Sequence, residues 1–290
     1  MSNRFSKPIL EKLRFEVNLA EHCNLNCVCC DHFSPVAEKK FLDSEQYERD
    51  LIRLAELFPD KVANVLLVGG EPLLHPGLTE IIALTRRHLP GSRVGLVTNG
   101  LLLPKMDLAF WEAARDNRLA ITVTNYPIKI DHERIRELTA QYGIVTDYSW
   151  GGKLKTMNKM VLDPEGSGEK GYNFKKCHRS NGCIMLQEGR LYTCTVAPTI
   201  GHFNRYFGQN IPLTDEDGID IYKAESGQEI LEFLRHPIPF CRYCDLRTRI
   251  KGLPWRQSGR EITEWFLTEG EKKKRDRRRR WRRFFFGDRK

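Results

Sequence analysis

Two hydrophobic patterns alternate along the first 160 residues. Apolar and polar side chains take turns over residues 13–19 (LRFEVNL), which predicts a strand with one face in the core. Asp43 and Gln46 then have the spacing of a helix cap, and apolar residues recur at helical intervals over 51–58. The same cycle repeats, with further strands expected at 62–68, 94–98, 119–124, 144–148 and 157–162, and helices at 77–89, 105–117 and 131–142.

Strands that alternate with helices in this way predict right-handed crossover connections and a parallel sheet. Six such units are too few for an eight-stranded barrel, so the expected fold class is α/β, a partial (β/α)6 TIM-like barrel over residues 1–162. A turn-rich segment (DPEGSGEKG) then opens a small irregular domain over 163–260, in which Ser226 and Glu229 have capping-box spacing. Residues 261–290 are expected to form a C-terminal helix and a basic tail.

The composition, with 40% hydrophobic and 29% charged residues among 290, is that of a globular protein. No run of eighteen apolar residues occurs, and the first ten residues lack the apolar core of a signal peptide, so a cytoplasmic location is expected. The net charge of +9 comes from residues 271–290, which hold 12 basic and 3 acidic residues. Because the rest of the chain is neutral, nucleic acid is not an expected partner.

Nine cysteines in a cytoplasmic chain require an explanation other than disulfides, because the cytosol keeps thiols reduced. They fall in three groups, and thiolates at short spacings are typical ligands of metals or iron–sulfur clusters. The groups are Cys23, Cys27, Cys29 and Cys30; Cys177, Cys183 and Cys194; and Cys241 and Cys244.

The first group has the spacing C-x3-C-x2-C directly after the first strand. Three thiolates, from Cys23, Cys27 and Cys30, can hold three irons of a 4Fe-4S cluster and leave the fourth iron open. The next strand ends in Gly69-Gly70-Glu71-Pro72. Together these motifs resemble the radical S-adenosylmethionine (radical SAM) superfamily over about residues 13–160. A zinc loop or buried free cysteines are the alternatives.

The resemblance implies that S-adenosylmethionine chelates the open iron and that its reductive cleavage yields a 5′-deoxyadenosyl radical. It implies that Gly69 and Gly70 let the main chain approach the cofactor and that Glu71 holds the methionine amine. A reducing partner such as flavodoxin or ferredoxin is implied as well. Polar residues at two further strand ends are candidate cofactor contacts, with turn formation as the alternative: Thr98, Asn99, Thr124 and Asn125.

The later cysteines resemble the Twitch domain, the shortened form of the SPASM domain. Cys177 is followed by eleven residues, Gly189, four residues and Cys194, and Cys241-x2-Cys244 lies after a capped helix. The resemblance implies a second 4Fe-4S cluster held by these four cysteines. A structural zinc site would use the same ligands. Cys183 is left over, and it is either a hydrogen-atom donor to a substrate radical or a buried small hydrophobe.

The resemblance to a Twitch-bearing aminocyclitol dehydrogenase favours an oxidoreductase that acts on a small polar substrate, a carbohydrate or cyclitol alcohol. His32, next to the last cluster cysteine, is a candidate general base, although such residues also hydrogen-bond loop backbone. The alternatives are a peptide-modifying enzyme, a redox-neutral epimerase and a non-enzymatic metal-binding scaffold. In the tail, Arg and Lys mixed with Trp281 and three phenylalanines favour an anionic membrane surface or an acidic partner, with a solvated tail as the alternative.

Overall fold

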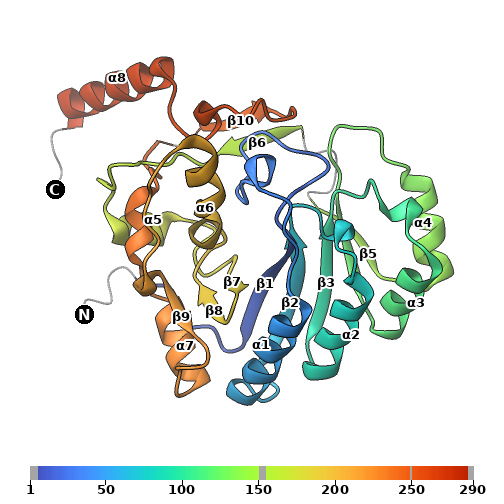
Figure 1. The fold of residues 1–290 in the computed structure, drawn as a ribbon. Coiled ribbons are helices and arrows are strands. Elements are labelled where there is room, and N and C mark those ends of the chain that lie inside the picture. The colour runs from blue at the N-terminus through green and yellow to red at the C-terminus, as the bar shows by residue number, and fades with distance from the viewer. Residues whose placement is uncertain (1–5, 150–154, 249, 287–290) are drawn as a thin grey trace.

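The computed structural model describes residues 6–149, 155–248 and 250–286, with side chains as far as Arg277. A mostly parallel sheet runs through its centre (Figure 1). The five parallel strands on one side lie in the order β5-β4-β3-β2-β1, and each is hydrogen-bonded to its neighbour. They are β1 (Leu13–Ala20), β2 (Val62–Gly69), β3 (Arg93–Thr98), β4 (Ala120–Thr124) and β5 (Thr146–Ser149).

Four helices connect these strands and pack on one face of the sheet (Figure 1). An aspartate begins three of them: Asp43 accepts hydrogen bonds from two backbone N–H groups of the first turn, and Asp107 and Asp131 accept one each. The helices are α1 (Ser44–Leu57), α2 (Leu78–His88), α3 (Leu108–Asp116) and α4 (His132–Gln141). The predicted strand–helix order is therefore confirmed to within a few residues at each end.

The sixth parallel strand lies elsewhere than expected. Residues 157–162 were predicted to supply it, but β6 (Thr156–Lys159) pairs antiparallel with β10 (Ile250–Pro254) in a separate two-stranded sheet. The sixth parallel strand is β7 (Met185–Gln187), which pairs with the free side of β1. The prediction was wrong because a short apolar segment fits several pairings, and the choice is made by a partner ninety residues away.

Two antiparallel strands, β8 (Arg190–Tyr192) and β9 (Gly218–Asp220), extend the sheet beyond β7. The sheet thus continues past the expected boundary at residue 162, and the division into three domains stays a prediction. The remaining helices are α5 (Lys170–Lys176), α6 (Val196–Phe207), α7 (Gly227–Leu234) and α8 (Glu269–Phe286). Ser226 caps α7 as expected, while the Glu229 carboxylate accepts from the backbone N–H of Glu225.

Alternation along β1 separates two environments. Phe15, Val17 and Leu19 belong to the core beneath the connecting helices. Glu16 and Asn18 therefore point to the opposite face, toward the C-terminal half of the chain. A second core fills part of that side, with Phe33, Phe203 and Trp265 in contact at its centre. Among the described residues, no helix is long and apolar enough to cross a membrane.

Candidate functional site

The carboxyl ends of β1 to β4 bring the sequence motifs to one edge of the sheet, as a parallel sheet requires. The cysteine loop follows β1, and the Leu25 N–H donates to Cys23 Sγ at 3.3 Å. Burial raises the pKa of the Cys27 thiol to about 11 and that of Cys30 to about 12. Without a metal these thiols stay protonated, and a bound iron would supply the positive charge that favours the thiolates.

A segment from the far end of the chain covers this loop, which sequence reasoning missed. The N–H of Val28 donates to the carbonyl of Arg256 at 3.0 Å, and the N–H of Ser258 donates to that of Asn26 at 2.7 Å. The Trp255 indole N–H donates to Cys27 Sγ at 3.2 Å. Donors of this kind tune the reduction potential of iron–sulfur clusters. The contact spans more than two hundred residues, so no local pattern signals it.

The two motif glycines make room for backbone. A β-carbon at Gly69 would lie 2.4 Å from the carbonyl oxygen of Ala20, and one at Gly70 would lie 2.1 Å from that of His22. Gly69 also has a φ of 130°, which L side chains rarely adopt. The glycines therefore allow the end of β2 to pack against the backbone that leads into the cysteine loop.

Glu71 is fully buried and joins two strand ends. Its carboxylate accepts hydrogen bonds from the Thr98 hydroxyl at 2.6 Å and from the backbone N–H groups of Asn99 and Leu73 at 2.9 and 3.1 Å. Loss of hydration raises the pKa of Glu71 to about 7 despite these donors. Pro72, also buried, starts the short turn that follows. In the structure, Glu71 and Thr98 thus fix the shape of the site edge.

Asn99 and Asn125 differ in what they can still bind. The Asn99 amide donates to Asn24 Oδ1 at 2.7 Å and accepts from the Leu101 N–H at 3.0 Å, so it holds the cysteine loop to β3. Thr124 Oγ1 is within 3.3 Å of Ser149 Oγ. Asn125 Oδ1 is buried and has no hydrogen-bond partner, and the next residue, Tyr126, hydrogen-bonds Cys27. An orphaned acceptor at this edge of the sheet fits a cofactor with an amine or hydroxyl group.

The four cysteines of the second expected site line one cavity, and Cys183 is not among its lining residues. Cys177 ends α5 and Cys194 precedes α6. Cys241 and Cys244 come from one short turn, and the backbone carbonyls of both cysteines accept hydrogen bonds from Asn173 Nδ2. Burial and the neighbouring thiols raise the pKa of Cys194 to about 11, and they raise the pKa values of Cys241 and Cys244 as well. Such thiols require a metal to become thiolates.

In the described part of the chain, no three His, Cys, Asp or Glu side chains are arranged around a single metal ion. The cysteines of a 4Fe-4S cluster each bind a different iron, so they need not converge on one point.

A buried polar cluster lies between the two cysteine sites. Its members come from β1, the cysteine loop, the segment before β7, and α6 with the residue that precedes it: Glu16, Asn18, Glu21, Asp31, His32, Arg179, Cys183, Thr195 and His202.

Arg179 Nε donates to Asp31 Oδ2 at 2.5 Å, and Arg179 also lines the cavity of the second site. His32 Nδ1 lies 3.1 Å from Asn18 Oδ1 and 3.4 Å from the Thr195 hydroxyl. Burial lowers the pKa of His32, so the imidazole is neutral at pH 7. Cys183 instead hydrogen-bonds Glu16, whose pKa burial raises to about 7. Both candidate catalytic residues of the sequence are therefore in this cluster.

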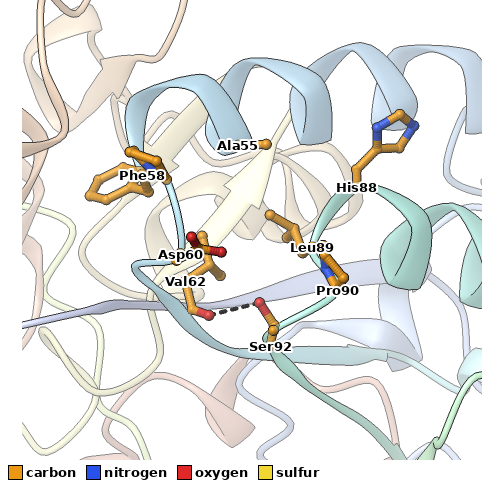
Figure 2. Close-up of a pocket in the computed structure, with 10 residues that line it drawn as sticks. Ala55, Phe58, Asp60, Val62, His88, Leu89, Pro90 and Ser92 are labelled. Atoms are coloured by element: carbon orange, nitrogen blue, oxygen red, sulfur yellow. Dashed lines mark hydrogen bonds between the residues drawn. The ribbon is translucent and has the colours of Figure 1, made fainter.

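A cavity of about 180 Å³ lies at the opposite edge of the sheet, between the end of α1, the start of β2 and the end of α2 (Figure 2). Phe58 and Leu89 line it, and the Ser92 hydroxyl donates to the carbonyl of Val62 at 2.7 Å (Figure 2). It holds none of the cysteines and lies at the amino ends of the strands, away from the motifs.

The family model for the radical SAM superfamily matches residues 17–143, the stretch that holds the cysteine loop and Gly69-Gly70-Glu71. Residues 17–143 form a radical SAM domain. Among curated proteins, the chain is 29% identical over 116 residues to a probable GTP 3′,8-cyclase of Thermoplasma volcanium, covering 40% of this chain and 33% of that protein. It is 36% identical over 104 residues to GTP 3′,8-cyclase 2 of Mycobacterium tuberculosis, covering 34% and 28%. The chain thus spans about a third or less of these relatives.

The fold of the chain also resembles a solved structure. The crystal structure of BtrN in complex with AdoMet and 2-DOIA aligns with a TM-score of 0.51 at 15% identity, covering 82% of this chain and 96% of that one. This likeness confirms the expected α/β fold class. The radical SAM match ends at residue 143, before the second group of cysteines, so the Twitch domain stays a prediction.

Proposed function

We propose that this chain is a radical SAM enzyme in which Cys23, Cys27 and Cys30 hold a 4Fe-4S cluster beside bound S-adenosylmethionine. When bound, this pair supplies a radical that abstracts a hydrogen atom from the substrate. The observation that supports the site most directly is the convergence of the three-cysteine loop with Glu71 and with the unpartnered Asn125 Oδ1 at one sheet edge.

The chain's own residues have separate tasks in this proposal. Glu71 keeps the ends of β2 and β3 together and leaves one lone-pair position for the methionine amine. Asn99 fixes the cysteine loop, and Asn125 accepts a hydrogen bond from the cofactor. The segment around Trp255 covers the loop and excludes water from it.

We further propose that Cys177, Cys194, Cys241 and Cys244 hold a second 4Fe-4S cluster. Their shared cavity supports the choice of these four cysteines, since Cys183 lies outside it. With four protein ligands, such a cluster has no open iron and is suited to take an electron from a substrate radical. This favours oxidation over hydrogen return.

The polar cluster between the sites favours a small polyhydroxylated substrate, a carbohydrate or cyclitol alcohol. Its carboxyl, amide and imidazole groups suit hydroxyl groups, and two of its buried atoms, Asp31 Oδ1 and His202 Nδ1, have no hydrogen-bond partner. A nucleoside triphosphate fits less well. Arg179 is already paired with Asp31, and the Glu21 carboxylate is nearby, so added phosphate charge would be repelled.

In an oxidation, neutral His32 would take a proton from the substrate hydroxyl. In the alternative, redox-neutral epimerisation, Cys183 would return a hydrogen atom to the opposite face. Peptide modification and a metal-binding scaffold remain as further alternatives, and a scaffold would cleave no S-adenosylmethionine.

The test measures iron, sulfide and zinc in anaerobically purified protein, together with dithionite-driven formation of 5′-deoxyadenosine. The wild type is expected to hold about eight irons. A Cys23→Ala/Cys27→Ala/Cys30→Ala variant should keep about four irons and lose cleavage, whereas Cys29→Ala, the matched control in the same loop, should keep both. If the wild type cleaves no S-adenosylmethionine, the proposed enzymatic activity is refuted. One zinc in place of the second four irons refutes the second cluster only.

A further inference from the structure

The last helix of the chain carries most of its unbalanced charge. Residues 269–286, which form α8, hold 10 basic and 3 acidic residues, whereas residues 1–270 are neutral overall. The side chains of Lys272, Lys273, Lys274 and Arg277 are exposed. α8 extends away from the body of the molecule (Figure 1). A helix with this charge attracts an acidic surface over a distance of about one Debye length, roughly 8–10 Å.

The first two turns of α8 are fixed to the body. Lys159 Nζ, whose side chain is 3% exposed, bonds Glu271 at 2.7 Å, and Arg275 lies 3.8 Å from Asp245. The Thr268 N–H donates to the Glu271 carboxylate at 2.8 Å, and the Glu271 N–H returns a bond to the Thr268 hydroxyl at 3.2 Å. The helix therefore starts from a set position.

That position is next to the first cysteine loop. Trp265, three residues before Thr268, donates its indole N–H to the carbonyl of Cys30 at 3.0 Å and is fully buried. The basic helix thus begins four residues after a side chain that hydrogen-bonds the backbone of the cysteine loop.

We propose that α8 is the docking surface for an acidic one-electron carrier protein that reduces this cluster. The inference rests on the proposed function, since that function requires an external electron. In the step itself, the carrier loses one electron and the cluster gains it, and no bond or proton changes place. An anionic membrane would meet the same charge, but it would not require the helix to start beside the cysteine loop. Proximity therefore favours the carrier.

The test compares two electron sources in three proteins. The first variant is Lys273→Glu/Lys274→Glu/Arg277→Glu, which reverses exposed charges on α8. The matched control is Lys12→Glu/Lys61→Glu/Arg93→Glu, which makes the same charge change at exposed positions near the amino ends of β1, β2 and β3. Cofactor cleavage is measured with dithionite, and separately with purified flavodoxin, its reductase and NADPH. Direct binding of oxidised flavodoxin is measured at low and high salt.

Dithionite-driven cleavage should be equal in all three proteins, because dithionite needs no docking surface. Flavodoxin-driven cleavage and flavodoxin binding should fall about tenfold or more in the α8 variant alone, and the salt dependence should weaken with them. Equal flavodoxin binding and equal flavodoxin-driven rates in the variant and the control would overturn the proposal. The proposal would also be overturned if the α8 variant kept its flavodoxin binding but no longer pelleted with phosphatidylserine vesicles, because that result assigns α8 to a membrane. A wild type inactive with dithionite refutes the proposed function instead, and the binding comparison still decides the docking surface.

Discussion

The glycines at the end of β2 leave space either for the backbone before the cysteine loop or for the bound cofactor. Gly70→Ala separates these two explanations. An alanine β-carbon would lie 2.1 Å from the carbonyl oxygen of His22 and 2.4 Å from its carbonyl carbon, whereas real contacts of this kind stay beyond about 3.0 Å. The φ of Gly70 lies outside the left-handed region that disfavours side chains, so the strain is purely steric. The backbone before Cys23 must move by about 1 Å, at a cost of about 1–3 kcal/mol, the usual range for overpacking.

A shift of that size matters for metal binding, because ligand distances hold to within about 0.2 Å. Gly70→Ala should therefore lower the free energy of unfolding of the metal-free protein in urea and lower the iron content of the first site. Gly91→Ala is the matched control, since a β-carbon there meets no atom within 4 Å. It should unfold like the wild type and load iron normally. A Gly70→Ala protein with normal stability and iron but no S-adenosylmethionine binding would refute this reasoning, because the space would then belong to the cofactor.

Other changes test separate parts of the structure. Burial raises the pKa of Glu16 from 4.5 to about 7, so the folded state binds this proton more tightly than the unfolded state does. This contributes up to about 3 kcal/mol to the free energy of unfolding at low pH, and the contribution is lost as the pH rises from about 4.5 through 7. Glu16→Gln should flatten that part of the stability–pH curve measured in urea, and an unchanged slope would contradict the burial argument. Trp255→Phe removes an N–H donor to Cys27 and should lower the reduction potential of the first cluster in an EPR-monitored titration, and an unchanged potential would contradict this role of the indole. Asp217→Ala leaves the N–H groups of Phe240 and Thr214 without their acceptor, which should cost about 1–3 kcal/mol and reduce metal content at the second site only; loss at the first site would show a global effect. Cys183→Ala should still cleave the cofactor, and if Cys183 donates hydrogen it should form no epimer, so normal epimer formation would exclude that role.

The sequence by itself determined the features that depend on neighbours along the chain. The alternation along β1, the aspartate caps of α1, α3 and α4, and the placement of both motifs at strand ends follow from local periodicity and backbone hydrogen bonding. The resemblance to the Twitch domain named the four cysteines that share the second cavity and left out Cys183, and their role as cluster ligands stays a prediction.

Tertiary structure alone decided the contacts between distant segments. Nothing local indicates that β7 pairs with β1, that Trp255 donates to Cys27, or that Arg179 bonds Asp31. These pairings depend on which surfaces remain after the helices have covered one face of the sheet. The hydrogen bonds of Glu71 were likewise decided by the fold. Its motif points to a cofactor contact, but three hydrogen bonds to its carboxylate come from its own turn and from the end of β3. A sequence motif records which groups are needed at a site, whereas the fold decides how many of their bonds the protein itself has already filled.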